Sequence, residues 1–147
     1  VAALHAMSLA RRLMKDEKGM LPVHQAAACN SLRALAFLLA DGSIDLVDDR
    51  GFTPLMHAVA ARSEEATVWL ARRTLDGNKR DFRGNSAVHW ASILGSVTMT
   101  SLLSNLKFDM ELLDSNGRSP LELAAMHGHL EVVEYLVLVY GVTNIAK

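Results

Sequence analysis

The chain has 147 residues, about one domain, and its 15 basic and 16 acidic side chains give a formal charge of −1. This balance and the lack of a basic stripe disfavour a nucleic-acid partner, and the apolar runs are far shorter than the ~20 residues of a membrane-spanning helix. Leucine and alanine dominate with 23 and 20 residues, against 8 aromatic residues, which is typical of closely packed helices. We therefore predict an all-α fold with no direct membrane insertion.

The N-terminal segment, residues 1–15, has Leu4, Met7, Arg11 and Met14 at helical spacing. We expect either a capping helix or part of an earlier repeat there. Because the chain begins with a valine, we expect it to be a fragment of a longer protein. It contains a single cysteine and no secretory signal pattern, so we expect an intracellular, cytoplasmic location, with the nucleus as the alternative.

The rest of the chain is built from one unit that recurs four times with a period of about 33 residues, over residues 16–47, 48–80, 81–113 and 114–147. Each unit begins with Asp-x-x-Gly and carries an alanine ten residues after the aspartate; the aspartates are Asp16, Asp48, Asp81 and Asp114, and the alanines are Ala26, Ala58, Ala91 and Ala124. Asp-x-x-Gly predicts a tight turn, in which the carboxylate accepts backbone N–H groups and the glycine adopts a positive φ.

Two short helices are predicted after each turn. Thr53-Pro54 and Ser119-Pro120 are typical helix starts, whereas Leu21 in the first unit provides no capping hydroxyl. After a break of two residues, a second helix carries apolar residues at helical spacing. One position of this helix is occupied by Phe37, Trp69, Leu102 and Tyr135, which we predict to lie in the core. In the last unit, Tyr140-Gly141 indicates one inserted residue before the loop.

These units resemble ankyrin repeats over residues 16–147. The resemblance rests on Thr53-Pro54-Leu55-Met56-His57-Ala58, Val88-His89-Trp90-Ala91 and Gly128-His129-Leu130-Glu131-Val132-Val133, which recur in phase. It implies an ankyrin-repeat solenoid of helix-turn-helix units with β-hairpin loops along one side and the shorter helices lining a concave face. It also implies that the motif histidines, His24 and His89, bind backbone groups of neighbouring loops.

Few residues support catalysis or metal binding. The six histidines are spread along the chain without a His-x-x-x-His pair, and no Cys-x-x-Cys or glycine-rich phosphate loop is present. Cys29 is expected to be a small buried thiol rather than a nucleophile. We therefore expect no cofactor, no metal site and no enzymatic activity in this chain, although its parent protein could be an enzyme.

The candidate site lies on the loop tips, whose side chains vary from unit to unit. Met20, Phe52 and Phe82 are apolar residues on turns that we expect to be exposed, and Trp90 is expected either to pack between repeats or to anchor a partner on the concave face. The candidate partner-binding residues are Lys18, Met20, Arg50, Phe52, Phe82, Arg83, Asn85, Trp90, Asn116 and Arg118. We predict a protein-interaction module that binds a peptide or folded protein partner and is monomeric in isolation.

Two alternatives stay open. Thr53-Pro54-Leu55-Met56 and Ala87-Val88-His89-Trp90-Ala91 are also similar to the ankyrin arrays of DHHC-type palmitoyltransferases. That similarity implies a substrate-recruiting or assembly domain of a larger multidomain protein, for example such an enzyme or a channel. The other alternative is an architectural spacer, or a homo-oligomer formed through the apolar C-terminal end at Leu138, Val139 and Tyr140.

Overall fold

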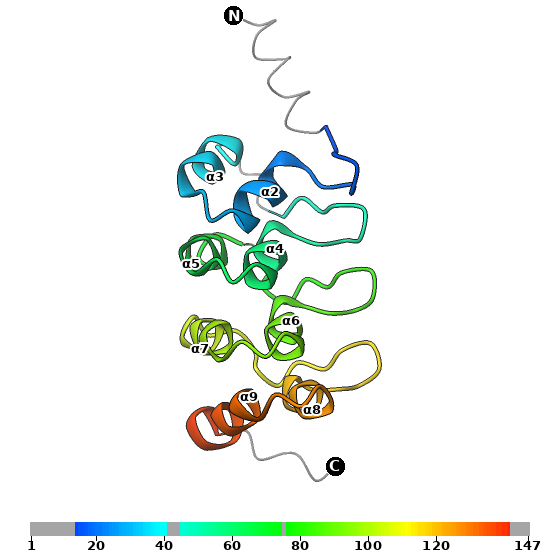
Figure 1. Ribbon diagram of the computed structural model, residues 1–147, viewed down its shortest axis with the longest axis vertical. Helices are drawn as coiled ribbons and strands as arrows, with labels where there is room; N and C mark the ends of the chain where they lie inside the picture. Colours follow the sequence, from blue (N-terminus) through cyan, green and yellow to red (C-terminus); the bar gives the residue numbers. More distant parts are fainter. Residues whose placement is uncertain (1–13, 41–44, 75, 142–147) are drawn as a thin grey trace, which may run out of the picture.

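The computed structural model describes residues 14–40, 45–74 and 76–141 (Figure 1). Within these ranges, eight α-helices stack as four pairs along one axis. The inner helices are α2 (Pro22–Ala28), α4 (Pro54–Ala60), α6 (Ala87–Ile93) and α8 (Pro120–Met126), and the outer helices are α3 (Leu32–Leu38), α5 (Glu64–Ala71), α7 (Val97–Asn105) and α9 (Leu130–Glu134). The expected all-α solenoid is confirmed, and most of the segment 1–15 lies outside the described residues.

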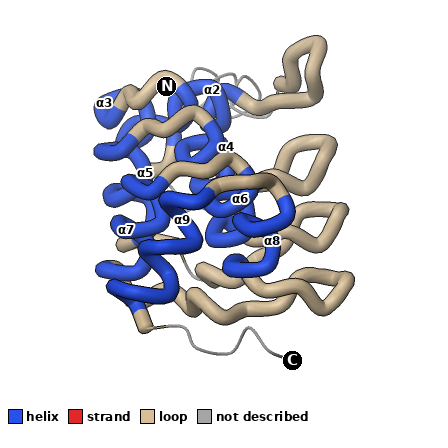
Figure 2. Tube along the Cα trace, turned by 60° about the horizontal axis from the view of Figure 1, so that its bottom comes forward, coloured by secondary structure: helices blue, strands red, loops and turns tan. Residues whose placement is uncertain are grey.

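The loops between the pairs all project on the same side of the stack, next to the inner helices (Figure 2). Each loop doubles back like a hairpin, with a hydrogen bond from the aspartate N–H to the carbonyl four residues on, as in Asp48 to Phe52 at 3.0 Å. One such bond is too little pairing for a β-strand, and the described residues contain helices, turns and loops only.

The helix starts agree with the capping residues predicted from the sequence. Thr53 Oγ1 accepts the N–H of Met56 at 3.2 Å, and Ser119 Oγ accepts the N–H of Glu122 at 3.2 Å. Leu21 makes no side-chain cap at α2. The imidazole of His24 takes over part of this role, because its Nδ1 accepts the N–H of Leu21 at 3.0 Å.

Small side chains allow the inner helices to pack closely. Ala58, Ala91 and Ala124 are fully buried, and each inner helix contacts the inner helix of the next pair. Larger side chains fill the space between the inner and outer helices; they include Leu35, Met56, Leu70, Met99, Leu103 and Leu136. The core is therefore a continuous strip along the stack rather than a central globule.

The aromatic position of the outer helices is only partly core, which corrects one prediction. Trp69, Leu102 and Tyr135 are partly buried and pack against the core, but the side chain of Phe37 is 63% exposed. Phe37 lies on α3, the first outer helix of the described stack. Within the described residues α3 therefore has another outer helix, α5, on one flank alone.

The last outer helix continues from α9 into a π-helical segment, η1 (Tyr135–Tyr140). The N–H of Gly141 closes it with a hydrogen bond to the carbonyl of Leu136 at 3.0 Å, five residues back. Each such hydrogen bond spans one residue more than the bond of an α-helix. It accounts for the extra residue that the sequence places before Gly141. In the described part of the chain, no helix has the length and apolar character needed to cross a bilayer.

Candidate protein-binding site between the second and third loops

The turn aspartates fix the shape of the loops. Asp48 Oδ1 accepts the N–H groups of Arg50 and Phe52, both at 2.9 Å, and Gly51 between them has a φ of 81°. Asp81 Oδ1 accepts two N–H groups in the same way in the third loop. Since a side chain would be strained at this φ, the glycine and the carboxylate together define the turn, as predicted.

The second oxygen of each turn aspartate is bound by a side chain nine residues further on. Gln25 Nε2 donates to Asp16 Oδ2 at 2.7 Å in the first repeat. The same donation is made by His57 Nε2 to Asp48 Oδ2, at 2.7 Å, and by Trp90 Nε1 to Asp81 Oδ2, at 2.9 Å. This pairing was not predicted from the sequence, although an N–H donor nine residues after three of the aspartates is a signal that could have revealed it.

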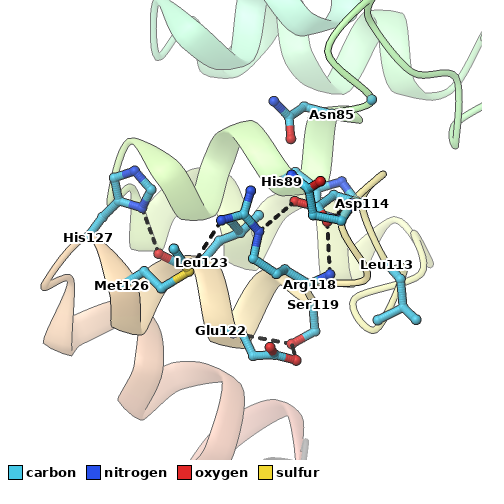
Figure 3. A network of polar contacts seen from close by, with 12 residues as sticks. Asn85, His89, Leu113, Asp114, Arg118, Ser119, Glu122, Leu123, Met126 and His127 are labelled. Atoms are coloured by element: carbon cyan, nitrogen blue, oxygen red, sulfur yellow. Dashed lines mark hydrogen bonds and ion pairs between the residues drawn. The ribbon is translucent and has the colours of Figure 1, made fainter.

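In the fourth repeat, a different residue binds the second oxygen of the turn aspartate. Leu123 stands nine residues after Asp114 and has no side-chain donor. Arg118 replaces it, because its Nε lies 3.3 Å from Asp114 Oδ2 while its Nη1 faces the sulfur of Met126 (Figure 3). The guanidinium of Arg118 is thus engaged in holding its own loop, and the side chain of Asn85 lies away from this network (Figure 3).

The Asp48–His57 pair is buried, and within it Asp48 is ionised while His57 is neutral. Burial lowers the pKa of His57, while the adjacent carboxylate acts to raise it. Burial acts to raise the pKa of Asp48, but hydrogen bonds from His57 and from the backbone outweigh it and the pKa falls below its usual value. A neutral imidazole therefore donates its Nε2 proton to an ionised carboxylate. This pair lies directly beneath Phe52, whose ring centroid is 5.2 Å from that of His57.

A hollow of about 300 Å³ opens between the second and third loops and α6. Its walls are the rings of Phe52, Phe82 and Trp90, and its rim carries two arginines and one aspartate: Arg50, Arg83 and Asp49. The ring centroids of Phe52 and Trp90 are 5.3 Å apart. Five of the ten predicted site residues thus meet at one place, which we call the aromatic pocket.

Phe52 differs from its prediction because it is only 7% exposed. Its backbone closes the turn on Asp48, and its ring points inward between His57 and Trp90. Trp90 is half-buried and packs against Phe52 of the preceding repeat, which is one of its two predicted roles, and its ring also lines the pocket.

Phe82 is the exposed member of the pocket, with 74% of its side chain accessible. Its backbone is nevertheless held, because its N–H donates to the carbonyl of Arg50 at 3.0 Å. Its ring rests on the backbone of Gly51, where a Cβ would come within 2.6 Å of a ring carbon. Two loops therefore hold this exposed ring in a fixed place.

The other predicted site residues lie elsewhere on the row of loops. Lys18 and Met20 line a separate hollow at the first loop, which also includes Cys29. The Cys29 thiol is exposed, contrary to the prediction of a buried one, because it follows the last residue of α2 at the helix end. Asn116 is exposed on the fourth loop. These residues do not converge with the aromatic pocket.

The motif histidines bind backbone groups of neighbouring loops, as the resemblance implied. His24 Nε2 lies 2.9 Å from the carbonyl of Leu46, and His89 Nε2 lies 2.7 Å from that of Leu112. Burial lowers the pKa of both imidazoles. Across the described ranges, no three histidine, cysteine or acidic side chains cluster in a way that could hold a metal ion.

Comparisons with known proteins point to one family. The family described as "Ankyrin repeats (3 copies)" matches residues 1–81 and 73–145. Human ankyrin repeat domain-containing protein 63 (Homo sapiens) is 34% identical over 117 residues, which cover 77% of this chain and 31% of that protein. Protein glp-1 of Caenorhabditis elegans is 31% identical over 132 residues, or 79% of this chain and 10% of that protein.

A third relative is NF-kappa-B inhibitor alpha of Homo sapiens, which is 34% identical over 91 residues, or 58% of this chain and 29% of that protein. The chain thus spans between 10% and 31% of the length of these three relatives. With four helix pairs, four Asp-x-x-Gly turns and a family match along nearly its whole length, the chain belongs to the ankyrin-repeat family.

Proposed function

We propose that this chain binds a protein partner and that the aromatic pocket is its principal contact. Ankyrin repeat domains generally act as protein-interaction modules. The observation that carries the proposal is the meeting of three rings, Phe52, Phe82 and Trp90, around one open hollow on the loop tips. Aromatic and arginine side chains around a pocket are the composition typical of binding hot spots.

The flanking loops extend this surface. Lys18 and Met20 on the first loop and Asn85, Asn116 and Arg118 on the third and fourth loops lie along the same row, on the side where all loops project. They would contact the partner on either side of the pocket and adjust its orientation. The partner is an extended peptide or a loop of a folded protein, since a hollow of about 300 Å³ accommodates one or two side chains.

Affinity capture with the purified chain tests this proposal. Phe82→Ala is the informative variant, because the side chain is 74% exposed and its removal leaves the core intact. Phe37→Ala is the matched control, since it removes another exposed phenylalanine from an outer helix. Partners that are lost with Phe82→Ala and kept with Phe37→Ala support the proposal. Partners that both variants retain would place the site elsewhere. Phe52→Ala is unsuitable because Phe52 is buried.

A second candidate function is that of a recruiting or assembly domain within a larger protein, such as a DHHC-type palmitoyltransferase or a channel. The small share of each relative's length that the chain covers, 10% to 31%, favours such a setting. The sequence of the full-length parent decides the matter. An Asp-His-His-Cys motif outside these residues would support the enzyme, and its absence would exclude that particular enzyme class.

We further propose that the isolated chain is monomeric and resides in the cytoplasm or the nucleus. A single cysteine with an exposed thiol, Cys29, is compatible with a reducing compartment. Light scattering tests the monomer. A dimeric mass would contradict it and would point to the C-terminal end, where Leu138 and Val139 are 77% and 71% exposed.

A further inference from the structure

The rim of the aromatic pocket carries hydrogen-bond donors that the chain itself does not use. Arg50 and Arg83 occupy the same place in successive Asp-x-x-Gly turns, so their side chains stand on the same edge of neighbouring loops. Among the described residues, the Arg83 guanidinium has no hydrogen-bond or ion-pair partner, and that of Arg50 has one distant contact, 3.9 Å to Asp48 Oδ2.

Each nearby carboxylate has a partner within the chain, through both oxygens for Asp48 and Asp81 and through one oxygen for Asp49. Asp48 and Asp81 are buried, and their oxygens accept hydrogen bonds from the backbone and from His57 and Trp90 respectively. Asp49, the exposed carboxylate of the rim, is paired with Lys15 at 2.5 Å. Because Lys15 offsets the charge of Asp49, the two guanidinium groups of Arg50 and Arg83 leave the mouth of the pocket with a net positive charge.

The Arg50 guanidinium is also held in place before any ligand arrives. Its Cζ lies 4.4 Å from the centroid of the Phe52 ring, and that ring is fixed by burial. A guanidinium stacked on an aromatic face keeps its edge, with the forked N–H groups, free for a planar anion. Less side-chain entropy is then lost on binding than with a freely rotating arginine.

We propose that the aromatic pocket recognises a peptide that carries a side-chain carboxylate beside a bulky apolar side chain. The inference rests on the pocket being the partner site proposed above, and it adds the chemistry of the occupant. The apolar side chain enters between Phe82 and Trp90, and the carboxylate accepts hydrogen bonds from Arg50 and Arg83 on the rim. Complementarity of this kind is charge-assisted, directional and weakened by salt.

The test uses short random peptides displayed on phage and selected on the 147-residue chain. The strongest binder is synthesised with a fluorescent label, together with a copy in which its acidic residue is replaced by the corresponding amide. Fluorescence anisotropy then compares four proteins: the unaltered chain, Phe82→Ala, the double variant Arg50→Gln/Arg83→Gln, and the control Arg33→Gln/Arg72→Gln. The control removes two exposed arginines, Arg33 on α3 and Arg72 directly after α5, and leaves the Asp-x-x-Gly turns unchanged.

The expected result is that the selected peptides are enriched in aspartate or glutamate next to an apolar residue. The amide copy and the Arg50→Gln/Arg83→Gln variant should each weaken binding at least about tenfold, since a charge-assisted hydrogen bond is lost. Binding should also weaken as salt rises from about 50 mM to about 500 mM. The Arg33→Gln/Arg72→Gln control should bind as the unaltered chain does.

Two other results separate the inference from the proposed function. Suppose that Phe82→Ala abolishes binding, whereas the amide copy binds the unaltered chain normally and the Arg50→Gln/Arg83→Gln variant binds the peptide normally. The pocket is then still supported as the partner site, but the inference that it recognises a carboxylate is overturned. If the selected peptides bind Phe82→Ala as well as the unaltered chain, or if no peptide is enriched, the pocket itself is refuted as the partner site.

Discussion

The buried hydroxyl of Ser92 leads to a prediction about the free energy of unfolding. Ser92 lies on α6, is fully buried, and its Oγ has no hydrogen-bond partner, which makes it the single such side-chain atom among the described residues. The corresponding position of the first repeat is Ala27, which is also fully buried. We therefore expect Ser92→Ala to increase the free energy of unfolding.

The size of the gain follows from three contributions. A buried hydroxyl without a partner costs ~1–3 kcal/mol, and alanine is more favourable than serine in a helix by up to ~0.5 kcal/mol. Removing one oxygen leaves a void of roughly 12 Å³, which costs about 0.3 kcal/mol. The net effect is ~1–3 kcal/mol of added stability, equivalent to a rise in Tm of roughly 2–12 °C.

Urea unfolding followed by far-UV circular dichroism measures this change. Ser96→Ala in the same repeat is the matched control, because Ser96 Oγ accepts the N–H of Met99 at 3.1 Å and caps α7. That substitution should destabilise the chain by about 1 kcal/mol. The same chemical change thus has opposite signs at two buried serines. A loss of stability with Ser92→Ala would show that the unpaired hydroxyl is not a source of strain.

Three further predictions concern two backbone positions and one buried histidine. Lys107 has a φ of 69°, so Lys107→Gly should stabilise the chain by ~0.5–1 kcal/mol in thermal unfolding, whereas Lys107→Ala, which retains the Cβ, should bring no gain. Gly95 and Gly128 occupy equivalent places with φ of 73° and 74°, but of the two only Gly95 would bring a Cβ against an imidazole, that of His129. Gly95→Ala should therefore cost at least about 1 kcal/mol more than Gly128→Ala, and equal costs would refute the clash. Burial lowers the pKa of His57 below its unfolded value, so the unfolded chain takes up the proton first and stability falls as pH drops below about 6.5. His57→Gln, which keeps an N–H donor for the turn aspartate, should reduce that fall between pH 7.5 and 5.5 in urea titrations. An unchanged pH dependence would contradict this account.

Local interactions are the part of the fold that the sequence predicts well. The turns, the caps at Thr53 and Ser119 and the roles of His24 and His89 depend on residues close in sequence or repeated at a fixed period. Each unit therefore carries the information for its own backbone, and the repeat multiplies it. Five of the ten candidate site residues were brought together for the same reason, because the repeat places equivalent loop tips side by side.

Burial of individual side chains is the part that could not be predicted in this way. Phe52 was expected on the surface, but its ring turns inward because two neighbouring rings, His57 and Trp90, are present to receive it. Phe37 was expected in the core, and it is exposed although its counterparts in later repeats are covered. Both outcomes depend on side-chain packing, within the repeat at His57 and against adjacent repeats at Trp90 and around α3, which the repeat pattern alone does not reveal.

The hydrogen bond to the second oxygen of each turn aspartate has a consequence for how such a surface can diversify. An amide, an imidazole and an indole, at Gln25, His57 and Trp90, satisfy the same acceptor from the same position. One N–H at the right distance is therefore the whole structural requirement, and the remainder of the side chain is left open to variation. The chain can change the chemistry that faces a partner, from polar to broadly aromatic, while the loop that displays it keeps its geometry.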